Sequence, residues 1–198
     1  MLIAYLAGSI PFAYLAGKLF KGIDLREHGS GNLGATNVFR MMGWKIASVV
    51  MLLDIAKGAL PVLLLPPHFA PSQPVLWAIA FGVAAIVGHV RSVFLLWKGG
   101  GKGVATAGGV FLALAPVPSL ISLSVWTIVL YLSGYVSLAS LASEVTLTIA
   151  VAIMYGVTSP ITIASAVTTL FVFWTHRTNI GRLRRGEENR FRRARPAT

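Results

Sequence analysis

A stretch of small polar residues interrupts a chain that is otherwise mostly apolar. Residues 28–37 read HGSGNLGATN, with three glycines among the ten positions. Asn32, Thr36 and Asn37 offer side-chain hydrogen bonds, and glycines let the backbone come close to a ligand because they carry no Cβ. This composition is suited to a loop that holds a compact polar ligand against its own backbone.

A second glycine-rich segment, WKGGGKGVAT at residues 97–106, places a lysine directly before a predicted helix. Free N–H groups and the positive end of the helix dipole favour an anion at a helix start, above all phosphate, and Lys102 adds a full charge. The segment is not a Walker motif, which needs Ser or Thr after its lysine, because Gly103 stands there. A flexible turn is the alternative, but two such loops, together with Arg40, favour phosphate binding.

Two further polar segments carry hydrogen-bond donors. In HRTNIGRLRRGEENRF, residues 176–191, a helix or tight turn would place His176, Asn179 and Arg182 on one side. All three can donate to phosphate oxygens, Arg through two nitrogens, although contact with lipid headgroups is the alternative for the arginines. The segment GYVSLASLAS, residues 134–143, is predicted to be a loop; its serines, at every third position, are also compatible with close helix packing.

Charged residues also occur inside apolar stretches. Asp54 and Lys57 lie three residues apart, and a charge at the centre of a membrane helix costs roughly 2.5–3.5 kcal/mol on insertion scales. We therefore expect the two side chains to pair and to face the protein interior, either as a structural pair or as part of the site. Glu144 is expected to cap the start of a later helix.

The composition is that of a protein with several membrane spans. The 198 residues are 56% hydrophobic and 12% charged, and soluble domains carry about twice that share of charge. Four ranges contain no Asp, Glu, Lys or Arg: 1–17, 58–90, 103–143 and 145–176. Each of these ranges is long enough to cross a bilayer at least once, since a crossing takes about 20 residues.

We predict an all-α fold with about seven transmembrane helices, some of them short or broken. The expected spans are 2–20, 45–65, 74–97, 104–115, 119–133 and two within 145–175. Pro116 and Pro118, and then Gly156 and Pro160, are expected to end the short ones. Five full spans with broken helices are the alternative.

The distribution of Lys and Arg predicts the orientation. With seven crossings these residues fall on one side, so the N-terminus would lie outside and the C-terminus in the cytoplasm. All four polar segments then share the cytoplasmic face, which predicts one site. Residues 1–176 would form a single transmembrane domain in a bacterial inner membrane, and residues 177–198 a basic cytoplasmic tail.

Several classes of chemistry are disfavoured. The chain has no cysteine, which excludes thiolate chemistry, and its four dispersed histidines indicate no metal site. The net charge of +11 is accounted for by cytoplasmic residues facing anionic lipid, so nucleic acid is not expected as a partner. A cofactor and an obligate protein partner are not expected either. A site rich in donors and poor in bases indicates an already activated substrate, with catalysis by positioning and electrostatic stabilisation.

The polar segments also resemble a known family. GSGNLGATN, GH followed by FLLWKGGGKGVAT, YVSLAS and HRTNIGRLRRGEE occur in this order and are similar to the signatures of the bacterial acyl-phosphate-dependent glycerol-3-phosphate acyltransferases. The resemblance runs from the first span to Glu188. The chain departs from the family pattern by one extra glycine in KGGGKG and by HVRSVF, which lacks the usual Pro after the histidine.

The resemblance implies transfer of a fatty acyl group from acyl phosphate to the sn-1 hydroxyl of glycerol 3-phosphate. The products would be lysophosphatidic acid and phosphate, the first acylation step of phospholipid synthesis. An acyl phosphate is a mixed anhydride, so no covalent acyl-enzyme is required, and the donor phosphate or a histidine would take the hydroxyl proton. The implied catalytic residues are Ser30, Lys102, His176 and Asn179, and the implied substrate-binding residues are Asn32, Thr36, Asn37, Arg40, Gly99, Gly100, Gly101, Gly103, Ser140 and Arg182.

A transporter of a phosphorylated solute is the main alternative function. Transporters also aim the N-termini of short helices at anions, but their binding groups lie near the membrane midplane, whereas nearly all candidates here are predicted on the cytoplasmic face. A lipid-binding scaffold would explain the basic tail but not two glycine-rich loops with a lysine.

Overall fold

The computed structural model describes residues 1–69 and 72–191, and within these residues all regular structure is helical. The predicted all-α fold is therefore confirmed. The chain divides into two compact units, Met1–Pro116 and Val117–Thr198, termed here the N-terminal and C-terminal units. The division into a transmembrane domain and a basic tail stays a prediction, and the last part of that tail, residues 192–198, lies outside the described residues.

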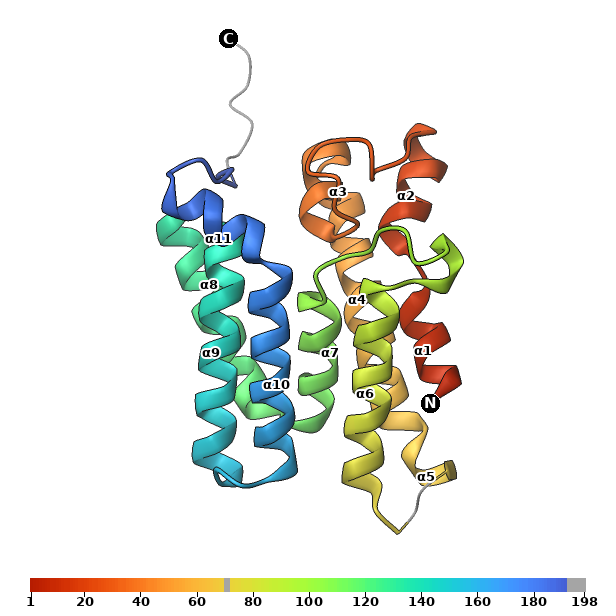
Figure 1. Ribbon diagram of the computed structural model, residues 1–198, viewed down its shortest axis with the longest axis vertical. Helices are drawn as coiled ribbons and strands as arrows, with labels where there is room; N and C mark the ends of the chain where they lie inside the picture. Colours follow the sequence, from red (N-terminus) through yellow and green to blue (C-terminus); the bar gives the residue numbers. More distant parts are fainter. Residues whose placement is uncertain (70–71, 192–198) are drawn as a thin grey trace. The chain divides into compact units, whose positions relative to one another are not determined.

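The N-terminal unit is built around the long helix α4, on which α3, α6 and α7 pack, while α1 packs on α6 (Figure 1). Pro11 interrupts the first predicted span, since a proline has no N–H to continue the hydrogen-bond ladder. The helices are α1 (Leu2–Ser9), α2 (Phe12–Lys21), α3 (Ala35–Met42), α4 (Trp44–Leu64), α5 (Pro66–Phe69), α6 (Pro74–Val90), the 3-10 turn η1 (Val93–Leu95) and α7 (Val104–Leu114).

Two glycines bring α4 and α7 into backbone contact. A Cβ at Gly58 of α4 would collide with the carbonyl group of Thr106, and a Cβ at Gly109 of α7 would collide with the carbonyl group of Ile55. Small residues at helix crossings are the usual way for membrane helices to approach closely. Helix α7 begins one residue after Gly103, so this crossing fixes the helix that carries the lysine loop at its start.

The buried charges of the N-terminal unit form a cluster. Lys57 Nζ lies 2.7 Å from Asp54 Oδ1, and the two side chains are only 4% and 2% exposed, so the predicted pairing is confirmed. Lys57 also donates a 2.8 Å hydrogen bond to the carbonyl of Ile10, at the break between α1 and α2. His89 of α6 is a third member, with Nδ1 3.7 Å from Asp54 Oδ1. The pair thus joins α4 to the broken first span.

The C-terminal unit packs α9 against α10, with the short helix α11 contacting both (Figure 1). Helix α8 is tied to α9 by a 2.7 Å hydrogen bond from Ser122 Oγ to the Ser143 carbonyl. Ser159 caps α10, because its hydroxyl accepts a hydrogen bond from the N–H of Thr162. The helices are α8 (Pro116–Ser133), α9 (Val136–Tyr155), α10 (Pro160–Thr175) and α11 (Arg177–Arg184).

Two predictions for this unit are wrong. Residues 134–143 are not a loop, because the turn ends at Gly134, whose φ is +73°, and α9 begins at Val136. The serines therefore lie on the first turns of a helix. Glu144 does not cap a helix start, because it lies in the middle of α9 and is buried there.

Within the described residues, five helical segments are long and apolar enough to cross a membrane. They are Leu2–Lys21, Trp44–Phe69, Pro74–Leu95, Pro116–Ser133 and Val136–Tyr155, and two shorter apolar helices are Val104–Leu114 and Pro160–Thr175. The expected breaks at Pro116 and between Gly156 and Pro160 are confirmed. The expected break at Pro118 is wrong, because α8 begins at Pro116 and Pro118 lies in its first turn, where a proline needs no N–H partner. A polytopic membrane protein is therefore supported, while the count of seven crossings and the orientation stay predictions.

Candidate functional site

The two glycine-rich loops of the N-terminal unit lie side by side. The first loop, residues 22–34, joins α2 to α3, and the second loop, residues 96–103, joins η1 to α7 (Figure 1). The carbonyl of Gly100 accepts hydrogen bonds from the N–H of Leu33 and from Asn32 Nδ2, both at 3.4 Å. Segments almost 70 residues apart are thus joined through backbone groups.

Asn37, at the start of α3, organises the first loop. Its Oδ1 accepts a 3.0 Å hydrogen bond from the Ser30 N–H, and its Nδ2 donates to the carbonyls of Leu25 and His28. The residue is 1% exposed. The side chain therefore holds the loop backbone in place, and its predicted contact with substrate stays a prediction.

The other predicted residues of the first loop border it. Ser30 is exposed at the tip of the loop, beside Gly29 and Gly31, which both have positive φ. Thr36 and Arg40 lie one helical turn apart on α3, where Thr36 is half-buried and Arg40 is exposed. Each of these polar side chains comes from the short connection between α2 and α4.

The second loop is shaped by close approach to the end of α6. A Cβ at Gly100 would collide with the carbonyl of Val90, and a Cβ at Gly101 would collide with the His89 ring. Gly99 and Gly103 adopt positive φ, +96° and +89°, a region that favours glycine. A side chain would collide with the end of α6 at positions 100 and 101 and would strain the backbone at positions 99 and 103, which explains the run of glycines.

Lys102 stands between the second loop and α7. Gly103 is the N-cap of this helix, which spans Val104–Leu114, so the predicted helix start directly after the lysine is confirmed. The first N–H groups of a helix have no carbonyl partner within the helix and carry partial positive charge. Lys102, itself half-buried, adds a formal charge beside them, and this arrangement can bind an anion.

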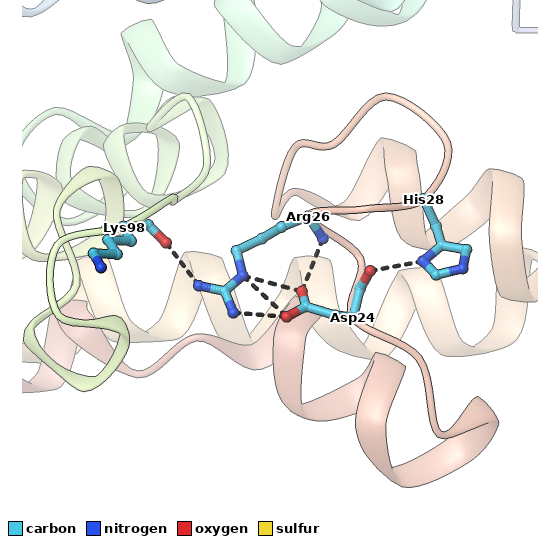
Figure 2. Close-up of polar contacts among 4 residues, drawn as sticks. All are labelled: Asp24, Arg26, His28 and Lys98. Carbon is cyan, nitrogen blue, oxygen red and sulfur yellow. Dashed lines mark hydrogen bonds and ion pairs between the residues drawn. The ribbon is translucent and has the colours of Figure 1, made fainter.

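A pair that the sequence analysis did not single out links the two loops. Arg26 Nη2 lies 2.6 Å from Asp24 Oδ2, and Arg26 Nη1 donates a 2.9 Å hydrogen bond to the carbonyl of Lys98. Figure 2 shows this bridge, with His28 Nδ1 bonded to the Asp24 carbonyl. The hydrogen-bonded guanidinium lowers the pKa of Asp24 from 3.8 to about 2.

In the C-terminal unit the polar residues converge on Glu188, whose side chain is 5% exposed. Glu188 accepts hydrogen bonds from Ser137 Oγ at 2.9 Å, Asn179 Nδ2 at 2.6 Å and Arg182 Nε at 2.7 Å. Burial alone would raise the pKa of Glu188, but the donors from Arg182, Asn179 and Ser137 outweigh it and hold the pKa below its usual value. This carboxylate was not a predicted site residue, because its donors come from separate elements.

His176 lies at the junction of α10 and α11. The residue is 3% exposed, and its Nδ1 lies 2.9 Å from the Val172 carbonyl. A carbonyl only accepts, so Nδ1 carries a proton and donates to Val172; in a neutral ring the lone pair then lies on Nε2. The hydroxyl of Ser140 on α9 donates to the Val136 carbonyl and accepts from Trp126 Nε1.

The predicted site residues thus fall into two clusters, one in each unit. The N-terminal cluster holds Ser30, Asn32, Thr36, Asn37, Arg40, Gly99, Gly100, Gly101, Lys102 and Gly103, and the C-terminal cluster holds Ser140, His176, Asn179 and Arg182. Their assignment to one common site stays a prediction.

Comparison with known proteins gives one consistent family. The model of the family described as "Glycerol-3-phosphate acyltransferase" matches residues 1–186. A glycerol-3-phosphate acyltransferase of Geobacillus kaustophilus is 43% identical over 92% of this chain and 90% of its own length. One of Geotalea daltonii is 44% identical over 96% of this chain and 95% of its own.

Two solved structures have the same fold. Both are of PlsY (YgiH), an integral membrane glycerol 3-phosphate acyltransferase. The glycerol 3-phosphate form has a TM-score of 0.88 at 39% identity and covers 96% of this chain and 93% of that one. The lysophosphatidic acid form has a TM-score of 0.83 at 37% identity, with 96% and 92% covered. This chain therefore belongs to the glycerol-3-phosphate acyltransferase family of integral membrane enzymes.

Proposed function

We propose that this enzyme transfers a fatty acyl group from acyl phosphate to the sn-1 hydroxyl of glycerol 3-phosphate, releasing lysophosphatidic acid and inorganic phosphate. One observation carries the proposal: two glycine-rich loops meet at the Gly100 carbonyl, two residues before Lys102 and close to the start of α7. No comparable observation favours a transporter, and the family membership argues against one.

The acyl phosphate lies against the first and second loops. Backbone N–H groups of the second loop and of the start of α7 bind its phosphate, except that of Gly101, which donates to the His89 carbonyl. Lys102 neutralises the charge that grows on this leaving group. Ser30, Asn32 and Thr36 complete the binding site. The arrangement supports this assignment because glycines at 100 and 101 let the loop backbone lie directly against the end of α6, which holds the loop in place beside the start of α7.

The glycerol 3-phosphate is held by cationic and hydrogen-bonding side chains, namely Arg40, Lys102, Ser140, His176, Asn179 and Arg182. Asn179 and Arg182 already hold the oxygens of a carboxylate, that of Glu188. Donors fixed in this way lose little conformational entropy when they bind an anion. Glu188 therefore acts as the buried acceptor that orients them.

The chemical step is direct displacement at the acyl carbon. The sn-1 oxygen forms a bond to the acyl carbon, and the bond from that carbon to the phosphate oxygen breaks. The hydroxyl proton goes either to the departing phosphate or to His176, whose tautomer, set by Val172, puts the lone pair on Nε2. The donor is already activated, so the reaction requires no cofactor.

The reaction takes place at the cytoplasmic face of a bacterial inner membrane, in a protein of about seven crossings. The exposed large apolar side chains of its spanning helices support contact with lipid tails, where the acyl chain of the donor would lie. Neither nucleic acid nor an obligate protein partner takes part.

The test uses purified protein in detergent or vesicles with radiolabelled glycerol 3-phosphate. Labelled lysophosphatidic acid should form with acyl phosphate and not with acyl-CoA or acylated carrier protein. Accumulation of label inside vesicles without new lipid would instead indicate transport. Lys102→Met should abolish turnover while the protein still folds, and Lys45→Met, at an exposed lysine on α4, should leave it intact. Full activity of Lys102→Met would contradict the phosphate-binding role.

A further inference from the structure

Arg26 and Asp24 form a bidentate ion pair. Its Nε lies 3.0 Å from Oδ1 and its Nη2 lies 2.6 Å from Oδ2 of the carboxylate, and its backbone N–H also donates to Oδ1 at 3.0 Å. The guanidinium carbon lies 5.3 Å from the centre of the Tyr14 ring, above its face. Such a forked pair has a defined geometry, so the third nitrogen, Nη1, is held in one direction.

That nitrogen reaches the second loop. Nη1 donates to the carbonyl of Lys98 at 2.9 Å (Figure 2), and the stem of Arg26 packs so closely on Gly99 that a Cβ there would lie 2.9 Å from Arg26 Cδ. With the bonds from Asn32 and Leu33 to the Gly100 carbonyl, two carbonyls of the second loop are drawn toward the first loop.

This arrangement sets the direction of the Gly99 amide. In a trans peptide unit the C=O and the N–H point in opposite directions, and the Lys98 carbonyl belongs to the same peptide unit as the Gly99 N–H. Holding that carbonyl toward Arg26 therefore turns the Gly99 N–H away from the first loop. Gly99 itself adopts a φ of +96°, a conformation that other residues rarely adopt.

We propose that Arg26 is a positioning residue that fixes the second loop in its phosphate-binding conformation and does not itself bind phosphate. This inference rests on the proposed function, because it assigns the loop to the acyl phosphate. The charge of Arg26 is already matched by Asp24, and the nitrogen that is not on the carboxylate is used on a carbonyl. Loss of Arg26 should therefore weaken the use of acyl phosphate more than that of glycerol 3-phosphate.

The kinetic test compares Arg26→Gln, Arg26→Lys and the control Arg91→Gln. Arg91 is an exposed arginine beside the loop, but its contact with the Trp97 carbonyl is long, 3.4 Å. Arg26→Gln should raise the KM for acyl phosphate about tenfold, the loss expected for one charge-assisted hydrogen bond, with the KM for glycerol 3-phosphate little changed. Arg26→Lys should bring the KM for acyl phosphate only part of the way back to the wild-type value, since an ammonium group keeps the charge but lacks the fork. Arg91→Gln should behave as wild type.

A second measurement does not depend on turnover. Hydrogen exchange followed by mass spectrometry reports the amides of residues 99–103, with inorganic phosphate as the probe. In Arg26→Gln the amides of the loop should exchange faster. About a tenfold higher phosphate concentration should be needed to protect them, because the variant lacks one charge-assisted hydrogen bond. The Arg91→Gln protein should match wild type in both respects.

The outcomes separate the two proposals. If wild type is protected by phosphate and Arg26→Gln needs more of it, the role of Arg26 stands even in a protein that forms no lysophosphatidic acid, and only the proposed function fails. Equal exchange and equal phosphate protection in wild type and Arg26→Gln would overturn the role of Arg26. So would a loop that loosens while phosphate protection and the KM for acyl phosphate stay at the wild-type value, or a wild-type loop that phosphate does not protect.

Discussion

Two adjacent glycines on α7 allow a sharp test of how the helix is held. Gly109 faces α4, where an added Cβ would collide with the Ile55 carbonyl, whereas a Cβ at Gly108 would meet nothing within 4 Å. Replacing each glycine by alanine makes the same chemical change one residue apart. Only Gly109→Ala should force α4 and α7 to separate.

The magnitude follows from two opposing effects. Alanine favours a helix over glycine by about 1 kcal/mol, and this gain is common to both variants, so it cancels in their difference. At Gly109 the obstacle is the backbone of Ile55, which cannot turn aside as a side chain could, and overpacking of this kind costs typically about 1–3 kcal/mol. Gly109→Ala should therefore be less stable than Gly108→Ala by about 1–3 kcal/mol.

The assay is unfolding of both variants in the same mild detergent, followed by tryptophan fluorescence. For a chain of this length each kcal/mol shifts the melting temperature by about 2–4 °C. Because α7 carries Lys102 next to its first turn, Gly109→Ala should also lose acyl transfer, and Gly108→Ala should retain it. Equal melting temperatures for the two variants would refute backbone contact between α4 and α7.

Two further predictions concern carboxylates. Glu188→Gln replaces one of the two oxygens that accept from three donors by an NH2 group and should cost about 1–3 kcal/mol of unfolding free energy. Glu187→Gln, in an ion pair more than half exposed, should change it by less than about 1 kcal/mol, and equal losses would contradict the cluster at Glu188. The pKa of Asp24 is lowered from 3.8 to about 2, so its stabilising effect is present above its unfolded pKa and is lost as the pH falls through about 2. Thermal unfolding between pH 5 and pH 2 should then show a steeper acid loss for wild type than for Asp24→Asn, and parallel curves would argue against the ion pair.

Local chemistry made much of the fold predictable from sequence. Pro116 and Pro160 have no backbone N–H to continue a helix, so the breaks at these positions could be placed in advance. Asp54 and Lys57 are three residues apart in an apolar stretch, and pairing lowers the free-energy cost of burying both charges. Their neighbour His89 could not be predicted, because it comes from another helix.

The misjudged features depend on tertiary contacts or on subtle boundaries. Residues 134–143 have the small and polar composition of a loop, yet only Gly134 makes the turn and the serines are helical. Glu188 gathers donors from α9 and α11, which no spacing in the sequence reveals. Arg26 acts through the carbonyl of Lys98, 72 residues away. Every residue has a backbone carbonyl, so the residue type at position 98 does not reveal this contact.

The hydrogen bond from Lys57 to the Ile10 carbonyl bears on how the protein is made. The donor lies 47 residues after the acceptor, so the first span leaves the ribosome before its lysine partner has been synthesised, by a delay on the order of several seconds. Until then the Ile10 carbonyl, at the Pro11 break of a predicted membrane span, lacks the Lys57 ammonium group as its hydrogen-bond donor. Lipid tails cannot replace that donor. The broken first span must therefore remain sheltered, at the translocon or in water, until the second long hydrophobic segment arrives.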